Sequence, residues 1–123
     1  LDEFNNLKVD LHVQGEPNLE DLEAQRLFFV IREALNNVVK HADVDEAGIT
    51  LDLGNDEVLL IVEDHGKGFD PSSIDPTENK LGLASMQERV EKFGGTLALD
   101  SQIGIGTKIT VEIPVTKEIT DGN

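Results

Sequence analysis

The sequence predicts an α+β fold: a two-layer sandwich in which a mixed sheet of about five strands is covered on one face by two or three helices. Apolar and polar residues alternate in several short runs, which is the period of a strand with one buried face. In two longer segments the apolar residues recur at the helical period. The strands follow one another mostly as hairpins, which indicates a mixed sheet.

The first predicted elements are a strand and a long helix. Leucine and valine occupy every second position of residues 7–13, which predicts a half-buried strand. From about Asp21 to His41 the apolar residues recur at helical spacing, and they are Leu22, Leu27, Phe28, Ile31, Leu35, Val38 and Val39. This range predicts one amphipathic helix with an acidic first turn.

A hairpin and a long loop come next. Two alternating runs, at about Glu46 to Leu53 and Glu57 to Glu63, flank the predicted turn Gly54-Asn55-Asp56. The stretch from Asp64 to Lys80 is rich in glycine, proline, serine and aspartate and has no period. Such a stretch, about 16 residues long, exceeds an ordinary connection, and loops of this length are usually functional lids.

A helix and two strands complete the predicted domain. Large apolar residues recur three or four positions apart in residues 83–93, and Gly94-Gly95 then ends this second helix. The last strands are predicted near Thr96 to Ser101 and near Thr107 to Pro114.

The length of 123 residues fits a single domain, whose core we place at about residues 5–115. The absence of cysteine excludes a disulfide framework and a thiolate metal site. No apolar run approaches the ~20 residues that a membrane span needs. We therefore expect a cytoplasmic domain, and any membrane anchor would lie outside this segment.

The strong negative charge limits the partners. A formal net charge of −15 repels nucleic acids and acidic membranes, so we expect neither as a partner. A nucleotide is also an anion, but five of the ten basic residues lie within or beside the motifs described next: Arg32, Lys40, Lys67, Lys80 and Arg89. Magnesium could supply further positive charge there.

The first motif is a polar stripe on the long helix, within residues 32–42. Glu33 and Asn37 stand four apart and therefore share one helix face, with Asn36 beside them and Lys40 three residues further on. A carboxylate, an amide oxygen and an ammonium in line suit magnesium and phosphate groups. The other interpretation is an ordinary solvated helix face.

The second motif, Glu63 to Asp70, directly follows a strand. Gly66 and Gly68 allow the backbone to turn sharply and to approach a flat ligand closely. Asp64 ends the strand with a side chain that only accepts hydrogen bonds, which suits an exocyclic amine. A plain turn with an aspartate at the strand end is the alternative.

The third motif, Lys80 to Met86, joins the lid to the second helix. Gly82 leaves backbone N–H groups accessible at a helix N-terminus, where phosphate is favoured. The alternative is a helix start that is packed through Leu81 and Leu83.

The fourth motif is Gly104-Ile105-Gly106-Thr107, between two strands. It predicts a hairpin turn in which the Thr107 hydroxyl could reach a nucleotide base.

In their order and spacing these four motifs resemble the N, G1, G2 and G3 boxes of the GHKL ATPase superfamily, which includes histidine kinases, gyrase-type topoisomerases, Hsp90 and MutL. The resemblance covers roughly residues 5–115. More narrowly, residues 32–37 (REALNN), 40–42 (KHA) and 82–90 (GLASMQERV) are similar to the nitrate-sensor/DesK-like sensor histidine kinases.

The resemblance implies a Bergerat-type fold, with ATP held between the long helix and a mobile lid. Asp64 would accept a hydrogen bond from the adenine amino group, aided by Thr107 through a water molecule. Asn37 would ligate Mg²⁺ bound to the phosphates, and Lys40 and His41 would lie near the phosphate tail. These roles follow from the resemblance and not from the spacing alone.

The resemblance also implies a catalytic role and a set of partners. Glu33 matches the candidate general base, which in the kinases would assist an incoming histidine. The other implied ATP contacts are Gly66, Gly68, Phe69, Lys80, Gly82 and Leu83. The implied partners are ATP, the dimerisation and phosphoacceptor helices of a parent kinase and, indirectly, a response regulator.

Two residues depart from the family pattern. Ser85 stands in place of a usual glycine, and Gln87 stands where arginine is common. The serine side chain would crowd the lid, which leaves the nucleotide affinity open. Ser85 therefore keeps one alternative open, a degenerate nucleotide-binding module that acts only through protein contacts. The other alternative is a stand-alone GHKL serine kinase of the anti-sigma type.

The substrate histidine of the family lies on a dimerising helix upstream of this domain. None of His12, His41 and His65 matches that context, so we expect none of them to be the phosphoacceptor. We expect the chain to be a monomeric fragment of a longer kinase that lacks the acceptor helix and cannot phosphorylate itself.

Overall fold

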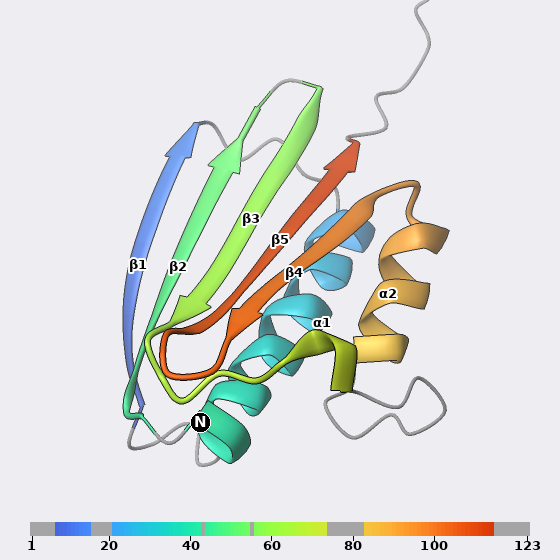
Figure 1. The fold of residues 1–123 in the computed structure, drawn as a ribbon. Coiled ribbons are helices and arrows are strands. Elements are labelled where there is room, and N and C mark those ends of the chain that lie inside the picture. The colour runs from blue at the N-terminus through green and yellow to red at the C-terminus, as the bar shows by residue number, and fades with distance from the viewer. Residues whose placement is uncertain (1–6, 16–20, 43, 55, 74–82, 115–123) are drawn as a thin grey trace, which may run out of the picture.

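The computed structural model describes residues 7–15, 21–42, 44–54, 56–73 and 83–114. Five strands form one sheet in the order β1-β2-β3-β5-β4, and both α-helices lie on the same face of this sheet (Figure 1). In chain order the elements are β1 (Lys8–Gly15), α1 (Asp21–Asn37), a π-helical turn (Val38–Ala42), β2 (Glu46–Leu53), β3 (Glu57–Asp64), a 3₁₀ turn (Pro71–Ser73), α2 (Leu83–Lys92), β4 (Thr96–Gln102) and β5 (Gly106–Pro114).

The sheet is mixed, as the sequence predicted. Strand β1 runs parallel to β2, because α1 lies between them in the chain and returns it to the starting edge. The pairs β2–β3, β3–β5 and β4–β5 are antiparallel. The predicted strand and helix boundaries agree with the observed ones to within two residues, except that the long helix changes to a π-helical turn after Asn37.

The core lies between the sheet and the helices. Alternate residues of the central strands point to the helix side, so each strand contributes apolar residues at period two. The most deeply buried large side chains are Leu60, Met86, Val30, Val58, Val90 and Val111. Full burial of such a side chain contributes about 1.5–3 kcal/mol, so this layer holds the two helices against the sheet.

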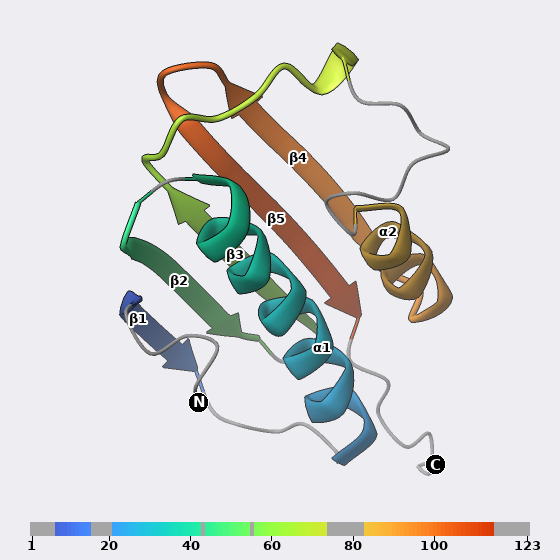
Figure 2. The ribbon, with the colours of Figure 1, turned by 90° about the horizontal axis from the view of Figure 1, so that it is seen from below.

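Strand β1 corrects one prediction. Its register with β2 places Val9, Leu11 and Val13 on the helix side of the sheet, as alternation requires. However, these side chains are 41%, 58% and 51% exposed, so the prediction of a half-buried strand was wrong. The physical reason is that β1 is an edge strand, and neither α1 nor α2 lies over it (Figure 2).

Two stacked cation–aromatic contacts join the helices. The guanidinium carbon of Arg89 in α2 lies 4.3 Å from the ring centre of Phe29 in α1. In the reverse direction, the guanidinium carbon of Arg26 lies 4.5 Å from the ring centre of Phe93. Contacts of this kind contribute about 0.5–1 kcal/mol at exposed sites. They fix α2, and therefore its first residue Leu83, relative to α1.

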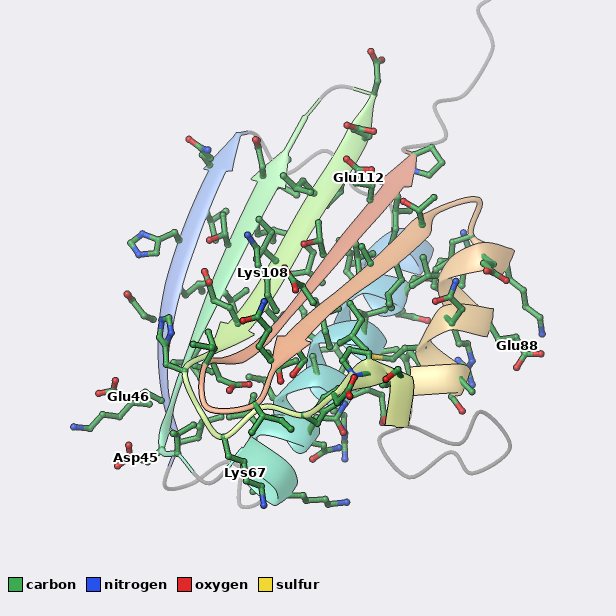
Figure 3. The ribbon with its side chains drawn as sticks, in the orientation of Figure 1. Asp45, Glu46, Lys67, Glu88, Lys108 and Glu112 are labelled. Atoms are coloured by element: carbon green, nitrogen blue, oxygen red, sulfur yellow. The ribbon has the colours of Figure 1, made fainter. Side chains whose placement is uncertain are left out.

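The opposite face of the sheet carries polar and charged side chains, such as Lys108 and Glu112 of β5 (Figure 3). Within the described residues, neither helix is long and apolar enough to cross a membrane.

Candidate nucleotide site

A pocket of about 450 Å³, part of it open to solvent, lies between the end of α1, the start of α2 and one end of the sheet. Apolar side chains form much of its wall: Ala34, Val38, Val62, Leu99 and Ile109. The rest of the wall consists of residues that the sequence assigned to ATP: Asn37, Asp64, Gly68, Phe69, Leu83 and Thr107. Each of the four motifs therefore contributes at least one residue to this cavity.

Asp64 places a carboxylate in this apolar pocket. It is the last residue of β3 and is only 7% exposed. Its Oδ1 accepts a hydrogen bond of 2.8 Å from the N–H of Gly66, two residues on in the chain. Within the described residues Oδ2 accepts no such bond, and a buried acceptor without a donor is costly. The pocket therefore presents an open acceptor that suits an N–H donor of a ligand.

The loop after β3 is fastened to the turn between β4 and β5. The N–H of Gly104 donates to the carbonyl oxygen of Lys67 at 2.8 Å. The side chain of Lys67 itself points away from the sheet (Figure 3). Loop and turn are more than thirty residues apart in the chain and are held together here. Gly68 and Phe69 of the loop line the pocket, as does Thr107, which follows the turn.

Two glycines allow this close approach. Gly68 has a φ of +62°, and a Cβ there would stand 2.0 Å from the carbonyl oxygen of Gln102. Gly106 has a φ of +134°, and its Cβ would stand 2.1 Å from the carbonyl oxygen of Asp64. Any side chain would force these backbones apart, so glycine is required at both positions.

Ser101 of β4 is a site residue that the sequence reasoning missed. It is 6% exposed, and its Oγ accepts a hydrogen bond of 2.9 Å from the N–H of Phe69. The same Oγ lies 2.8 Å from Oγ1 of Thr107 and 3.1 Å from the carbonyl oxygen of Gly106. A signal was present in the sequence, because Ser101 follows Leu97 and Leu99 at every second position, which places a hydroxyl on the buried face.

The polar stripe of the long helix lies only partly in the pocket. Asn37, the last residue of α1, lines it, whereas Glu33 is half-buried one turn earlier and lies outside its lining. Lys40 is exposed on the π-helical turn Val38–Ala42. Such turns are rare and occur frequently at functional sites.

Other predicted site residues lie elsewhere. Gly66 is buried beside Asp64 and outside the lining of the pocket. The predicted contacts Lys80 and Gly82 lie outside the described residues, as does the side chain of His41. Ser85, which departs from the family pattern, lies half-buried in the first turn of α2.

Comparison with known proteins agrees with this geometry. Residues 23–117 match the family described as histidine kinase-, DNA gyrase B-, and HSP90-like ATPase. The chain belongs to this ATPase family. The resemblance inferred from the sequence is thereby confirmed.

The curated relatives of this ATPase domain are sensor kinases. The chain is 38% identical over 120 residues to the signal transduction histidine-protein kinase/phosphatase DegS of Bacillus subtilis (strain 168). This alignment covers 93% of this chain and 31% of DegS. The chain is 37% identical over 111 residues to the oxygen sensor histidine kinase NreB of Staphylococcus carnosus (strain TM300), covering 89% of this chain and 32% of NreB. The chain therefore spans about a third of the length of these relatives. Neither alternative, the serine kinase or the degenerate module, is favoured by them.

Solved structures share the fold. The histidine kinase AdeS of Acinetobacter baumannii superposes with a TM-score of 0.74 at 20% identity, over 94% of this chain and 59% of AdeS. The blue-light activated histidine kinase EL346 of Erythrobacter litoralis gives 0.73 at 24% identity, over 94% of this chain and 37% of that chain. The predicted mixed five-stranded sheet with helices on one face is therefore confirmed.

The donor set of this ATPase domain limits how it could hold a metal ion. Among the described residues no group of three or more histidine, cysteine, aspartate or glutamate side chains could hold one. Magnesium commonly binds proteins through one or two side chains together with substrate phosphates and water. Asn37 offers one amide oxygen at the pocket wall, which fits an ion that arrives with a nucleotide.

A capped turn lies in the loop after β3. The hydroxyl of Ser72 donates to Oδ1 of Asp70 at 2.8 Å, and the Ser72 N–H donates to the same oxygen at 3.0 Å. These bonds, the side-chain bond first, lower the pKa of Asp70 below its ordinary value. The chain thus leaves the pocket through a defined turn at Pro71–Ser73.

Proposed function

We propose that this chain is the single ATP-binding catalytic domain of a sensor histidine kinase. It would bind Mg-ATP and transfer the γ-phosphoryl group to a histidine on dimerisation helices that lie outside these residues. A response regulator would then receive the phosphoryl group from that histidine, so that its relation to this domain is indirect. The proposal places the domain in the cytoplasm, where ATP is available.

The open acceptor of Asp64 is the observation that carries the proposal. A 7%-exposed carboxylate in an apolar pocket requires a donor, and the adenine amino group supplies one. Adenine is flat and apolar on both faces, which suits walls made of Leu99, Ile109 and the Phe69 ring. Thr107 is the cross-strand neighbour of Asp64 and adds a hydroxyl at the same edge of the base.

The phosphate tail would extend past the end of α1. Asn37 would hold Mg²⁺ together with the phosphate oxygens, and the ion would neutralise the charge that develops during phosphoryl transfer. Lys40, on the exposed π-helical turn next to Asn37, would contact the phosphates, and so would His41. The positive end of α2, which begins at Leu83, would add to this field together with Lys80 and Gly82 of the lid.

Glu33 would act on the incoming histidine. It lies one helical turn before Asn37 and is half-buried, close to where the γ-phosphate would emerge. A carboxylate there could accept or orient the imidazole N–H of the attacking histidine, so that the other ring nitrogen is free to attack. Its role is therefore positioning and proton handling rather than activation of water.

The described histidines do not suit the acceptor role. His12 lies on strand β1 and contacts the carboxylate of Asp10 at 3.3 Å, and His65 follows β3 in the loop. Neither lies on a helix that could pack against a second copy. The acceptor would therefore come from helices in the rest of the parent protein.

The test has two arms. The first is calorimetric titration of the chain with ADP and with a non-hydrolysable ATP analogue, with and without Mg²⁺. We expect binding that Mg²⁺ strengthens for the analogue. The second supplies the dimerisation helices of the parent kinase in trans with Mg-ATP, and we expect acid-labile phosphate on their histidine. Nucleotide binding without any such transfer would contradict the kinase proposal and would favour a binding module.

A further inference from the structure

Ser101, Thr107 and Asp64 form a row across three strands on the helix side of the sheet. Thr107 is the cross-strand partner of Ser101 in the β4–β5 pair and of Asp64 in the β5–β3 pair. Asp64 and Thr107 line the pocket, whereas Ser101, next to Thr107 on the edge strand β4, is not part of its lining. No motif in the sequence marks Ser101, yet it contacts two of the four predicted boxes.

The hydroxyl of Ser101 is hydrogen-bonded to both sides of the pocket wall. Its Oγ accepts from the Phe69 N–H and holds one proton of its own. That proton goes either to the carbonyl oxygen of Gly106, at 3.1 Å, or to Oγ1 of Thr107, at 2.8 Å. In the first case Thr107 donates to Ser101, and in the second it accepts. Both arrangements hold Thr107 Oγ1 against Ser101. The first leaves two lone pairs of Oγ1 for a ligand, and the second leaves one proton and one lone pair.

The consequence lies on the pocket side of Thr107. Because one hydrogen-bonding direction of Thr107 Oγ1 is used by Ser101, the directions left for a ligand beside the Asp64 carboxylate are restricted. The bond to Phe69 also fixes the loop that carries the aromatic wall of the pocket. One buried hydroxyl thus sets both the polar edge and one apolar wall.

We propose that Ser101 is a positioning residue for the nucleotide base: it orients Thr107 beside Asp64, and it holds the loop after β3 in place through the N–H of Phe69. This proposal rests on the proposed nucleotide-binding function. Ser101 touches no ligand itself, and it acts through Thr107 and Phe69. It therefore governs affinity for adenine and discrimination against bases that lack the amino group.

The experiment compares Ser101→Ala, Thr107→Val and the double variant. Each is titrated with ADP and with IDP, which has an oxygen in place of the adenine amino group. Loss of one net hydrogen bond predicts a three- to tenfold weaker Kd for ADP in Ser101→Ala, roughly, with a smaller change for IDP. Because both hydroxyls act at one edge of the base, we expect the double variant to lose less affinity than the product of the two single losses.

Two controls separate positioning from general destabilisation. Thr110→Val removes a hydroxyl from β5, the strand of Thr107, but on the face of the sheet that points away from the helices. Val58→Ala lowers stability at the far end of β3, where Val58 is paired with Ile113. Both should keep the ADP affinity and the ratio of ADP to IDP affinity of the unchanged chain. Amide hydrogen exchange of Phe69 without nucleotide should accelerate in Ser101→Ala and stay slow in both controls.

The outcomes are distinct. An unchanged ADP affinity in folded Ser101→Ala, or an unchanged ratio of ADP to IDP affinity, would overturn the proposal and leave Ser101 a purely structural residue. Strictly multiplicative single effects would also overturn it, because Ser101 would then not act through Thr107. If the unchanged chain binds no ADP, the proposed function fails and this role fails with it. Slow amide exchange of Phe69 in the unchanged chain would then show that the hydrogen bond from Phe69 to Ser101 is present and that the assignment of ADP as the ligand is wrong.

Discussion

Gly106→Ala tests the joint between the loop after β3 and the turn before β5. The added Cβ would stand 2.1 Å from the carbonyl oxygen of Asp64, whereas real Cβ contacts essentially never fall below 3.0 Å. One of the two backbones must therefore move by about 1 Å, and overpacking of this kind costs about 1–3 kcal/mol. The alanine must also adopt a φ of +134°, and backbone strain of this kind costs about 1–3 kcal/mol.

Gly104→Ala is the matched control in the same turn. Gly104 has a φ of +82°, so its replacement also incurs backbone strain. A Cβ there would meet no atom within 4 Å, so the overpacking cost is missing. We expect Gly106→Ala to lower the free energy of unfolding by about 1–3 kcal/mol more than Gly104→Ala does.

The same movement should reach the pocket. A shift of about 1 Å at Asp64 misplaces its carboxylate and should weaken ADP binding roughly tenfold or more. Gly104→Ala should leave ADP binding within about twofold, because it keeps the N–H that donates to Lys67 and its added Cβ meets no atom within 4 Å. Urea unfolding and ADP calorimetry on both variants measure the two effects. If Gly106→Ala is no less stable than Gly104→Ala and binds ADP equally well, the close contact described here does not position Asp64.

Three further predictions follow from the burial, the capped turn and the proposed metal ligand. Leu60→Ala should cost about 2–5 kcal/mol of unfolding free energy, because Leu60 is fully buried, whereas Leu11→Ala on the uncovered edge strand should cost under about 1 kcal/mol. Equal losses in urea unfolding would contradict the described core. Ser72→Ala should raise the pKa of Asp70 toward its ordinary value. Because the pKa of Asp70 is lowered in the folded chain, its carboxylate stabilises the turn at pH values above the ordinary pKa, and this stabilisation is lost as the pH falls through the lowered pKa. An NMR titration in which Asp70 has the same pKa in Ser72→Ala as in the unchanged chain would refute the cap. Asn37→Ala should remove most of the gain in affinity that Mg²⁺ gives to the ATP analogue, and an undiminished gain in calorimetry would place the metal elsewhere.

The sequence was sufficient for the layers of the fold. Alternation at period two and recurrence at the helical period report directly which side of a strand or helix is apolar, and β2 was predicted with the bounds that it has in the structure. The same pattern cannot report whether another element covers that side. This is why Leu11 was placed on the correct face of β1 and yet assigned the wrong burial.

The site was predictable only in part for a similar reason. The family resemblance brought Asp64 and Thr107 together at the adenine, but nothing in the local pattern reveals that β3 and β5 pair in a register that makes them neighbours. Ser101 escaped because its role depends on the β4–β5 register, which places it beside Thr107, and on a loop contact to Phe69, 32 residues earlier. Long-range register, rather than residue type, was the missing information.

The most direct test of the central claim is calorimetric titration of Asp64→Asn with ADP. The neutral amide replaces the acceptor with a group that can present N–H to the base, and loss of a hydrogen bond to a charged group costs about 1.5–3 kcal/mol, or roughly 10- to 150-fold in Kd. Asp100→Asn, an exposed carboxylate on β4, is the matched control and should bind as the unchanged chain does. A folded Asp64→Asn that binds ADP as tightly as Asp100→Asn would contradict the assignment of this pocket to adenine.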